Sequence, residues 1–364
     1  MVCVSDVAKG VLMAGTVLFS GMAVGDPPDV RHGSVPDGRQ VLSFEGGLVM
    51  TWQHAGAVRA ANDELLASLD LVATLPKGNG VWTLYVEGDV TPSPAGSSTL
   101  DPVVNADAGT ALDGEGAGRL QVSGLHYSHP VGEGSVTFGL LDPARFLDAS
   151  EVANDETRQF LAAALVNNPT IGLPDYTLGA AYHYDAEQWS PGITLLFADG
   201  AGLAGGKGSY AELFSLQGGL FSALELYWQP APLTMRLGGW HRTLPMSGTN
   251  GGERRGFYAL AEGELEGLRW NLRGGIAGGV EVQTDSYVAV ATALPFGDVT
   301  VGAGWAYLDR KGGTPVEQVE CYVRADVGEA LQLTADLQWL EQAEREGEVF
   351  RGLTVTGFRL AFLF

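Results

Sequence analysis

The sequence predicts an all-β protein: a transmembrane antiparallel β-barrel of about sixteen strands. Segments of about ten residues alternate apolar and polar side chains, as strands do when their two faces meet different surroundings. Glycine contributes 52 of 364 residues and charged residues only 18%, which favours many short strands over long helices. The last segment places Phe358, Leu360, Phe362 and Phe364 on one face. We expect it to close the barrel, because lipid cannot satisfy an open sheet edge.

The alternation is clearest in residues 331–339, and residues 233–238 and 269–276 repeat it with arginines on the polar face. Such segments have the length that a tilted strand needs to cross a bilayer. Aromatic residues near the predicted strand ends suggest interfacial girdles, the alternative being aromatics scattered through a core. They are Trp228, Trp240, Trp270, Trp305, Tyr307 and Trp339.

The pattern divides the chain into sixteen predicted strands, an even number that brings both ends of the barrel to the same side of the membrane. Their ranges are 41–54, 67–76, 80–91, 119–129, 134–142, 174–185, 191–198, 219–229, 232–244, 254–265, 268–279, 285–294, 297–308, 315–327, 330–340 and 352–364.

Three segments do not alternate. Residues 92–118 and 199–218 are rich in glycine and polar residues, which predicts long loops. Residues 148–168 predict a short loop helix, with Asp148 or Ser150 as its N-cap and one apolar stripe, ended by the proline that follows. In a barrel such a helix either folds inward and narrows the pore or packs over the mouth.

The N-terminus predicts a signal peptide over residues 1–25, with Lys9 before an uncharged apolar stretch and small residues before the cleavage site. Residues 26–40 then form an N-terminal segment and 41–364 the barrel. Cleavage would remove Cys3 and leave Cys321 alone, so we expect no intramolecular disulfide. Export without a helical span places the protein in the outer membrane, or free outside the inner membrane as a soluble secreted β-protein.

The net charge of −22 makes DNA or RNA an unexpected partner. The sequence carries no nucleophile elbow, phosphate-binding loop or CxxC pair. His126 and His129 are three residues apart, which on a strand puts them on opposite faces. We therefore expect no catalytic residues, no metal and no cofactor.

The polar face of the strands supplies the candidate pore-lining residues. If Phe358, Leu360 and Phe362 contact lipid, Arg359 points inward, since a charge facing lipid is costly. Inward charges could contact solutes, or could pair across the lumen to hold the barrel. The candidates are Glu225, Arg236, Arg242, Arg269, Arg273, Glu320, Arg324, Asp326, Asp336 and Arg359.

Several blocks of the sequence, taken as a set, are typical of one family. They are 146–150 (FLDAS), 154–156 (NDE), 159–161 (QFL), 166–169 (VNNP), 174–176 (PDY), 178–180 (LGA), 317–324 (EQVECYVR), 331–339 (LQLTADLQW) and 358–362 (FRLAF). With these blocks the chain resembles the carbohydrate-selective porin (OprB) family. Residues 331–339 depart from its pattern, with Ala335 where the family favours proline and Trp339 where it favours tyrosine.

The resemblance implies a sixteen-stranded outer-membrane barrel that passes small hydrophilic solutes, often sugars, by passive diffusion. Its partners would be outer-membrane lipid and those solutes, with a homo-oligomer left open. Two other functions stay open: a non-selective ion-conducting porin, and a structural barrel that sheathes a partner protein.

Overall fold

The computed structural model describes most of the predicted barrel. The described residues are 41–56, 63–91, 99–107, 118–185, 191–200, 202–203, 210, 213, 219–243, 252–280, 282–345 and 347–364. The predicted signal peptide, the 26–40 segment and Cys3 lie outside them, as do parts of the loops predicted at 92–118 and 199–218.

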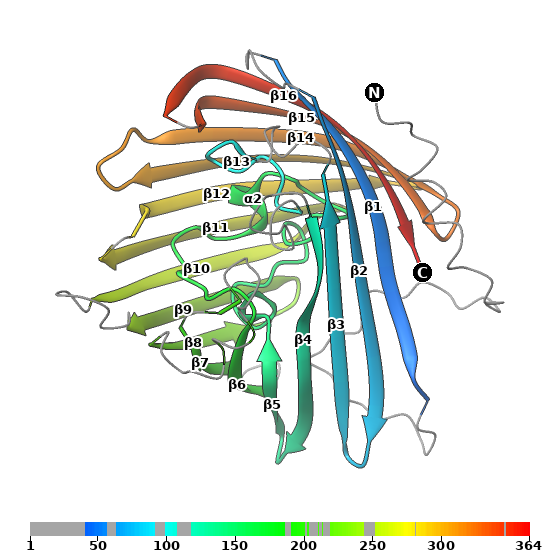
Figure 1. The fold of residues 1–364 in the computed structure, drawn as a ribbon, viewed down its shortest axis with the longest axis vertical. Helices are drawn as coiled ribbons and strands as arrows, with labels where there is room; N and C mark the ends of the chain where they lie inside the picture. The colour runs from blue at the N-terminus through cyan, green and yellow to red at the C-terminus, as the bar shows by residue number, and fades with distance from the viewer. Residues whose placement is uncertain are drawn as a thin grey trace.

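All sixteen predicted strands are confirmed, and they form one closed antiparallel barrel (Figure 1). The strands are β1 Ser43–Ala55, β2 Asp63–Lys77, β3 Gly80–Val90, β4 Gly118–Val131, β5 Gly134–Leu141, β6 Thr177–Tyr184, β7 Gly192–Asp199, β8 Leu220–Trp228, β9 Leu233–Thr243, β10 Glu253–Leu265, β11 Leu268–Gly279, β12 Thr284–Phe296, β13 Val299–Arg310, β14 Val316–Val327, β15 Leu331–Arg345 and β16 Glu348–Leu363. Among the described residues, no helix has the length and apolar character to cross a membrane.

The barrel closes where the first strand meets the last. β1 pairs with β16 along its length, with Met50 opposite Leu360. At the end of this seam the backbones of Gly46 and Phe364 exchange two hydrogen bonds, of 2.8 and 3.0 Å. The expected role of the terminal strand is confirmed, since it is hydrogen-bonded to its end.

The two faces of the strands differ as the alternation predicts. On β16, Phe358 and Phe362 are 47% and 49% exposed on the outer surface, whereas Arg359 between them is fully buried inside. Cys321 is exposed on the outer face of β14. An outer wall of this composition would be unstable in water and matches a lipid environment.

The predicted aromatic girdles are right for some residues and wrong for one. Trp228 and Trp339 are exposed on the outer surface at 38% and 39%. Trp240 instead points inward, is 5% exposed and packs against Phe221 and Ile171. The reason is its register, because Trp240 shares the inward parity of Arg236 on β9.

The connections differ at the two ends of the barrel. At one end neighbouring strands are joined by tight turns, such as that at Gly297, whose φ of 60° suits glycine. At the other end the connection from β5 to β6, residues 142–176, lies inside the barrel together with its one short helix, α2 (Figure 1). We call residues 142–176 the inner loop.

Candidate functional site: the inner loop and the inner wall

The inner loop is largely irregular, so the prediction of a helix over 148–168 is wrong for most of its length. A 3-10 turn, η2, spans Pro143–Arg145 and is capped by the Asp142 carboxylate, which accepts from the Ala144 N–H at 3.0 Å. The only α-helical turn among the described residues of the loop is α2, Ala163–Val166. Its buried residues Leu165 and Val166 pack toward β12 and β13.

Side chains of the loop accept hydrogen bonds from its backbone N–H groups, which in a helix would donate to backbone carbonyls. The Ser150 hydroxyl accepts from the N–H groups of Val152 and Ala153, and the Asp155 carboxylate from those of Thr157 and Arg158. Side chains of this kind compete with the helix for the backbone, which is why they favour turns. The loop therefore keeps an irregular path whose remaining polar groups face the barrel wall.

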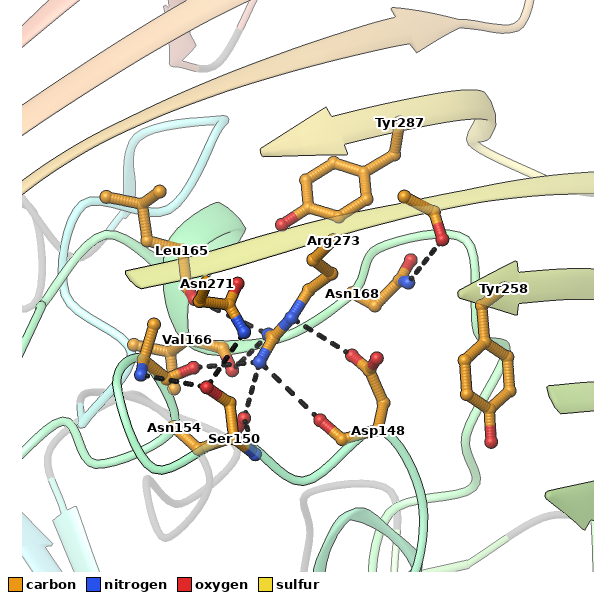
Figure 2. Close-up of polar contacts among 12 residues, drawn as sticks. Asp148, Ser150, Asn154, Leu165, Val166, Asn168, Tyr258, Asn271, Arg273 and Tyr287 are labelled. Carbon is orange, nitrogen blue, oxygen red and sulfur yellow. Dashed lines mark hydrogen bonds and ion pairs between the residues drawn. The ribbon is translucent and has the colours of Figure 1, made fainter. Parts of the chain in front are cut away.

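Arg273 of β11 is the centre of the attachment (Figure 2). It is 1% exposed. Its Nη atoms donate to the carbonyls of Val166 at 3.0 Å and Ala153 at 2.9 Å, and to Asn154 Oδ1 at 2.6 Å. Its Nε lies 3.4 Å from the Asp148 carboxylate. One guanidinium thus joins both ends of the segment predicted to be helical.

Two wall carboxylates hold loop N–H groups. Both oxygens of Glu320 on β14 accept, from Leu161 at 2.8 Å and from Ala162 at 2.7 Å. Glu225 on β8 accepts from the Asp148 N–H at 2.7 Å. Both glutamates are 0% exposed. Each buried charge is therefore balanced by hydrogen bonds to the backbone that it positions.

Two further arginines bind loop carbonyls. Arg359 of β16 donates to the carbonyls of Glu156 and Gln159, and Arg324 of β14 donates to the carbonyl of Arg158 at 2.8 Å. The most deeply buried of the predicted charges therefore all contact the loop backbone. These residues are Glu225, Arg273, Glu320 and Arg359. We call the inner faces of β8–β16 that carry these groups the anchoring wall.

The other predicted residues have different surroundings. Arg236 is buried and pairs with Glu225 at 2.8 Å. Arg242 donates to the Gly172 carbonyl of the loop at 3.2 Å. Arg324 also lies 3.1 Å from Asp326. Arg269 is not brought to the loop: it lies near the turn end of β11, its side chain is 54% exposed, and its nearest acid, Glu264, is 4.0 Å away. Asp336 lies inside and is 5% exposed.

A second inward segment supports the first. Residues 99–107, between β3 and β4, reach β15 and β16, where Leu100 and Val104 pack against Leu353. The Ala106 N–H donates to the Leu161 carbonyl at 2.7 Å, so this segment also pairs with the inner loop. The two segments together form a layer across part of the lumen.

The inner faces of β2 and β3 carry acids, and we call them the acidic wall. Glu64, Asp70, Glu87 and Asp89 lie on them. The hydroxyl of Tyr85 donates to Asp70 at 2.7 Å and to Glu87 at 2.8 Å. The arginines of the anchoring wall pair with other carboxylates, those of Glu225, Asp148 and Asp326. The acidic wall therefore carries inward acids, whereas the anchoring wall carries inward arginines and acids together.

A small cavity of about 30 Å³ lies between the start of the inner loop and the inner faces of β3–β7 and β9. This cavity is lined by aromatic, hydroxyl and charged side chains. They include Tyr85, His126, Thr137, Arg145, His183, Thr194 and Arg236.

Burial raises the pKa of two acids in the inward segments, Asp148 and Asp107. Burial, offset in part by Arg273, raises the pKa of Asp148 to about 7. Burial also raises the pKa of Asp107, against the hydrogen bond donated by Ser68. Both groups resist ionisation because they have left bulk water.

Sequence reasoning missed the acidic wall, Arg145 and the tyrosines that hold the loop. Tyr287 donates to the Ala164 carbonyl at 2.5 Å and Tyr258 to Glu225 at 2.9 Å. The parity rule that pointed Arg359 inward would also have found Glu87, because it alternates with outward residues of β3. Arg145 lies in a loop, where no periodicity marks it. Among the described residues, no cluster of acids, histidines or cysteines has the composition to hold a metal ion.

Solved structures of known proteins share this fold. OprB of Pseudomonas putida superposes with a TM-score of 0.72 at 14% identity, covering 89% of this chain and 94% of that one. An OmpT variant of Vibrio cholerae lacking loop L8 gives 0.59 at 11% identity, covering 89% and 99%. An anion-selective porin from Comamonas acidovorans gives 0.57 at 12%, covering 90% and 100%.

Comparison of amino-acid sequences matches a smaller share of the chain than comparison of structures does. A protein of Aquifex aeolicus (strain VF5), described as uncharacterized, is 27% identical over 251 residues, 67% of this chain and 69% of that protein. No protein-family model matches the chain. The similarity to the carbohydrate-selective porin OprB, predicted from the sequence, is confirmed in the structure, and at these identities it establishes a porin fold.

Proposed function

We propose that this protein is an outer-membrane porin, exported by its signal peptide, through which small hydrophilic solutes and in particular sugars diffuse passively. The observation that carries the proposal is the inner loop. A closed sixteen-stranded barrel is wide enough for an aqueous channel, and a loop bound on several walls narrows it.

The preference for sugars is supported by the chemistry of the remaining space and by the likeness to OprB. Rings and hydroxyl groups line it together with charged groups, a mixture suited to polyhydroxylated solutes. Of the ten residues predicted to line the pore, six position the loop, Arg236 borders the cavity, and Arg269 does neither. The six are Glu225, Arg242, Arg273, Glu320, Arg324 and Arg359.

Swelling of liposomes that contain the purified protein tests the proposal. We expect swelling with monosaccharides and, more slowly, with disaccharides, because a narrowed channel sorts solutes by size. Empty liposomes, and liposomes with an unrelated barrel of fewer strands, serve as controls. No swelling with any sugar, from protein shown to be folded, would contradict the proposal.

A non-selective ion-conducting porin is the second candidate, and the inward charges of the acidic wall favour it. Charged groups on the wall of a lumen concentrate ions of the opposite sign. The two candidates separate in planar bilayers, where added sugar reduces the ion current of a sugar-binding channel and leaves that of the other unchanged. A barrel that sheathes a partner is less favoured, since described segments of the chain itself cross the lumen. Recovery of a partner protein in stoichiometric amounts in pulldowns would support the sheathing function instead.

A further inference from the structure

The outer face of β8–β12, neighbouring strands on one side of the barrel (Figure 1), carries a groove of about 570 Å³. Small residues line its centre, Ala259 and Ala261 of β10 and Gly274 of β11. Leu237 and Leu272 border it and are 60% and 50% exposed. The volume far exceeds the roughly 30 Å³ that a water molecule occupies. The groove therefore has room for an apolar chain.

The groove is part of the surface that meets lipid. Its outward-facing lining is apolar from Trp228 of β8 to Val288 of β12. Acyl chains fill a concave apolar surface of this kind more favourably than water does. Apolar lining alone does not select one lipid over another, so any preference must come from polar groups near the groove.

Three cationic side chains meet at the loop end of β11, on the strands that carry the groove. Arg254 Nε and Lys311 Nζ donate to the backbone carbonyls of residues 280 and 279, at 2.9 and 2.7 Å. Arg255 lies opposite Gly278 in the register of β10 and β11. We call Arg254, Arg255 and Lys311 the rim cluster.

Arg255 is the member of the rim cluster that faces outward from a strand. It shares the parity of Phe257, which is 64% exposed. Among the described residues its guanidinium has no hydrogen-bond or ion-pair partner. A side chain added at the neighbouring Gly278 would meet nothing within 4 Å, so this face has space for a headgroup. A phosphate there would neutralise a charge that lipid tails cannot.

The acids of this rim have other positions. The Glu253 carboxylate lies 3.5 Å from His241 of β9. Asp309 faces outward from β13, two strands away from β11. Asp285 of β12 has the inward parity. The outer face at the end of β11 therefore carries more positive than negative charge, which suits an anionic headgroup. Guanidinium groups match the geometry of phosphate oxygens in particular.

The rim cluster and the groove are spaced as the two ends of one lipid. Arg255 and Ala259 are four residues apart on β10, about 14 Å along a strand and about 10 Å in depth at the usual tilt. Half of a hydrocarbon core is about 15 Å. Phe257 and Ile276, opposite each other in the register and both exposed, give apolar surface between the two. A lipid with its headgroup at Arg255 can therefore reach the groove with a chain.

We infer that this face binds a phosphate-bearing lipid of the outer leaflet, with its phosphate at Arg255 and Lys311 and an acyl chain in the groove. The rim cluster lies at the end of the barrel that carries the longer connections, which in outer-membrane barrels is the external side. The inference goes beyond the proposed transport function, since it concerns the outer wall and not the lumen.

Native mass spectrometry of the detergent-solubilised mature protein, titrated with lipid A, tests the inference. Dephosphorylated lipid A is the control ligand and should bind about tenfold more weakly or less. Arg255→Gln should weaken binding of lipid A about five- to tenfold, the effect of one charged contact at a membrane surface. Arg351→Gln is the matched control, because Arg351 is also exposed near the loop end, but on β16. It should not change the affinity.

A second pair of variants tests the groove. Ala259→Leu fills part of it and should weaken binding of lipid A about four- to tenfold, because the acyl chain loses the burial of one or two methylene groups. Ala303→Leu, at an exposed outward alanine of β13 outside the groove, should have no effect. If Arg255→Gln does not assemble, Lys311→Gln tests the same cluster and should weaken binding about two- to fivefold.

The inference is overturned by unchanged affinity in Arg255→Gln, by an equal loss in Arg351→Gln, or by equal binding of dephosphorylated lipid A. Dimers that Ala259→Leu disrupts, with binding of lipid A unchanged, would assign the groove to a second copy of the chain and overturn it too. Lipid binding is measured without passage of any solute. Its failure would therefore leave the proposed transport function to be decided by liposome swelling.

Discussion

The acidic wall and the anchoring wall both carry inward charges, yet they use them differently. On the anchoring wall, the charged groups of Arg273, Glu320 and Arg359 form hydrogen bonds with the backbone of the inner loop. Asp70 accepts from the hydroxyl of Tyr85 on its own wall, and Glu87 accepts from the hydroxyls of Tyr85 and of Tyr176, the last residue of the inner loop. Inward orientation therefore does not by itself make a charge part of the solute path. An inward charge can equally hold the inner loop, which shapes the solute path.

Arg273→Ala should give the largest effect. It removes the group that binds both ends of the loop segment and leaves the carbonyls of Val166 and Ala153 without a donor. Breaking a buried charged network of this kind costs about 3–5 kcal/mol. We expect larger, noisier single-channel conductance and a lower melting temperature, because the loop would leave its position.

Arg269→Ala is the matched control for Arg273→Ala. It removes the same residue type from the same strand, but at an exposed position whose nearest acid is 4.0 Å away. Conductance and melting temperature should stay at wild-type values. Equal effects of the two variants would mean that the loop does not depend on the anchoring wall.

Glu320→Gln should have a smaller effect in the same direction. The amide keeps one acceptor oxygen, so one of the N–H groups of Leu161 and Ala162 loses its partner. The cost is about 1–3 kcal/mol. Current noise from the loop should increase while mean conductance rises less than in Arg273→Ala. Quieter current than wild type would contradict the anchoring role.

The two walls also differ in how far sequence reasoning could find them. Strand parity placed Arg359 inside because lipid excludes charge, and all sixteen strands followed from the same alternation. The helix predicted over 148–168 is confirmed only at Ala163–Val166, because most partners of the segment are distant in sequence. Ser150 and Asp155 take N–H groups locally, and Glu320 and Arg273 bind other backbone groups from across the barrel. No local pattern records those partners. Arg145 was not among the candidate residues because no periodicity marks a residue of a loop. Trp240 is a different case, because its parity with Arg236 on β9 already points it inward.

Asp70→Asn tests the acidic wall and should spare the loop. Asp70 accepts from the Tyr85 hydroxyl at 2.7 Å, and an amide oxygen can still accept. Removing one inward negative charge should lower the ratio of cation to anion permeability by roughly twofold. The reversal potential in a potassium chloride gradient measures this ratio. An altered melting temperature with unchanged selectivity would place Asp70 among the anchoring groups.

The smallest effect should come from pH, acting through Asp148 where the loop meets Arg273 and Glu225. Burial raises the pKa of Asp148 from 3.8 to about 7, so the folded protein binds this proton more tightly than the unfolded chain does. The resulting stability is fully present below pH 3.8 and is lost as pH rises through 7. The loop should therefore be held more firmly at pH 5 than at pH 8, with less current noise and a higher melting temperature. Asp148→Asn is uncharged at every pH and should remove this dependence. If Asp148→Asn retains the whole pH effect, another group is responsible for it. If the wild type is noisier at pH 5 than at pH 8, the ionised carboxylate stabilises the loop and the expected direction is wrong.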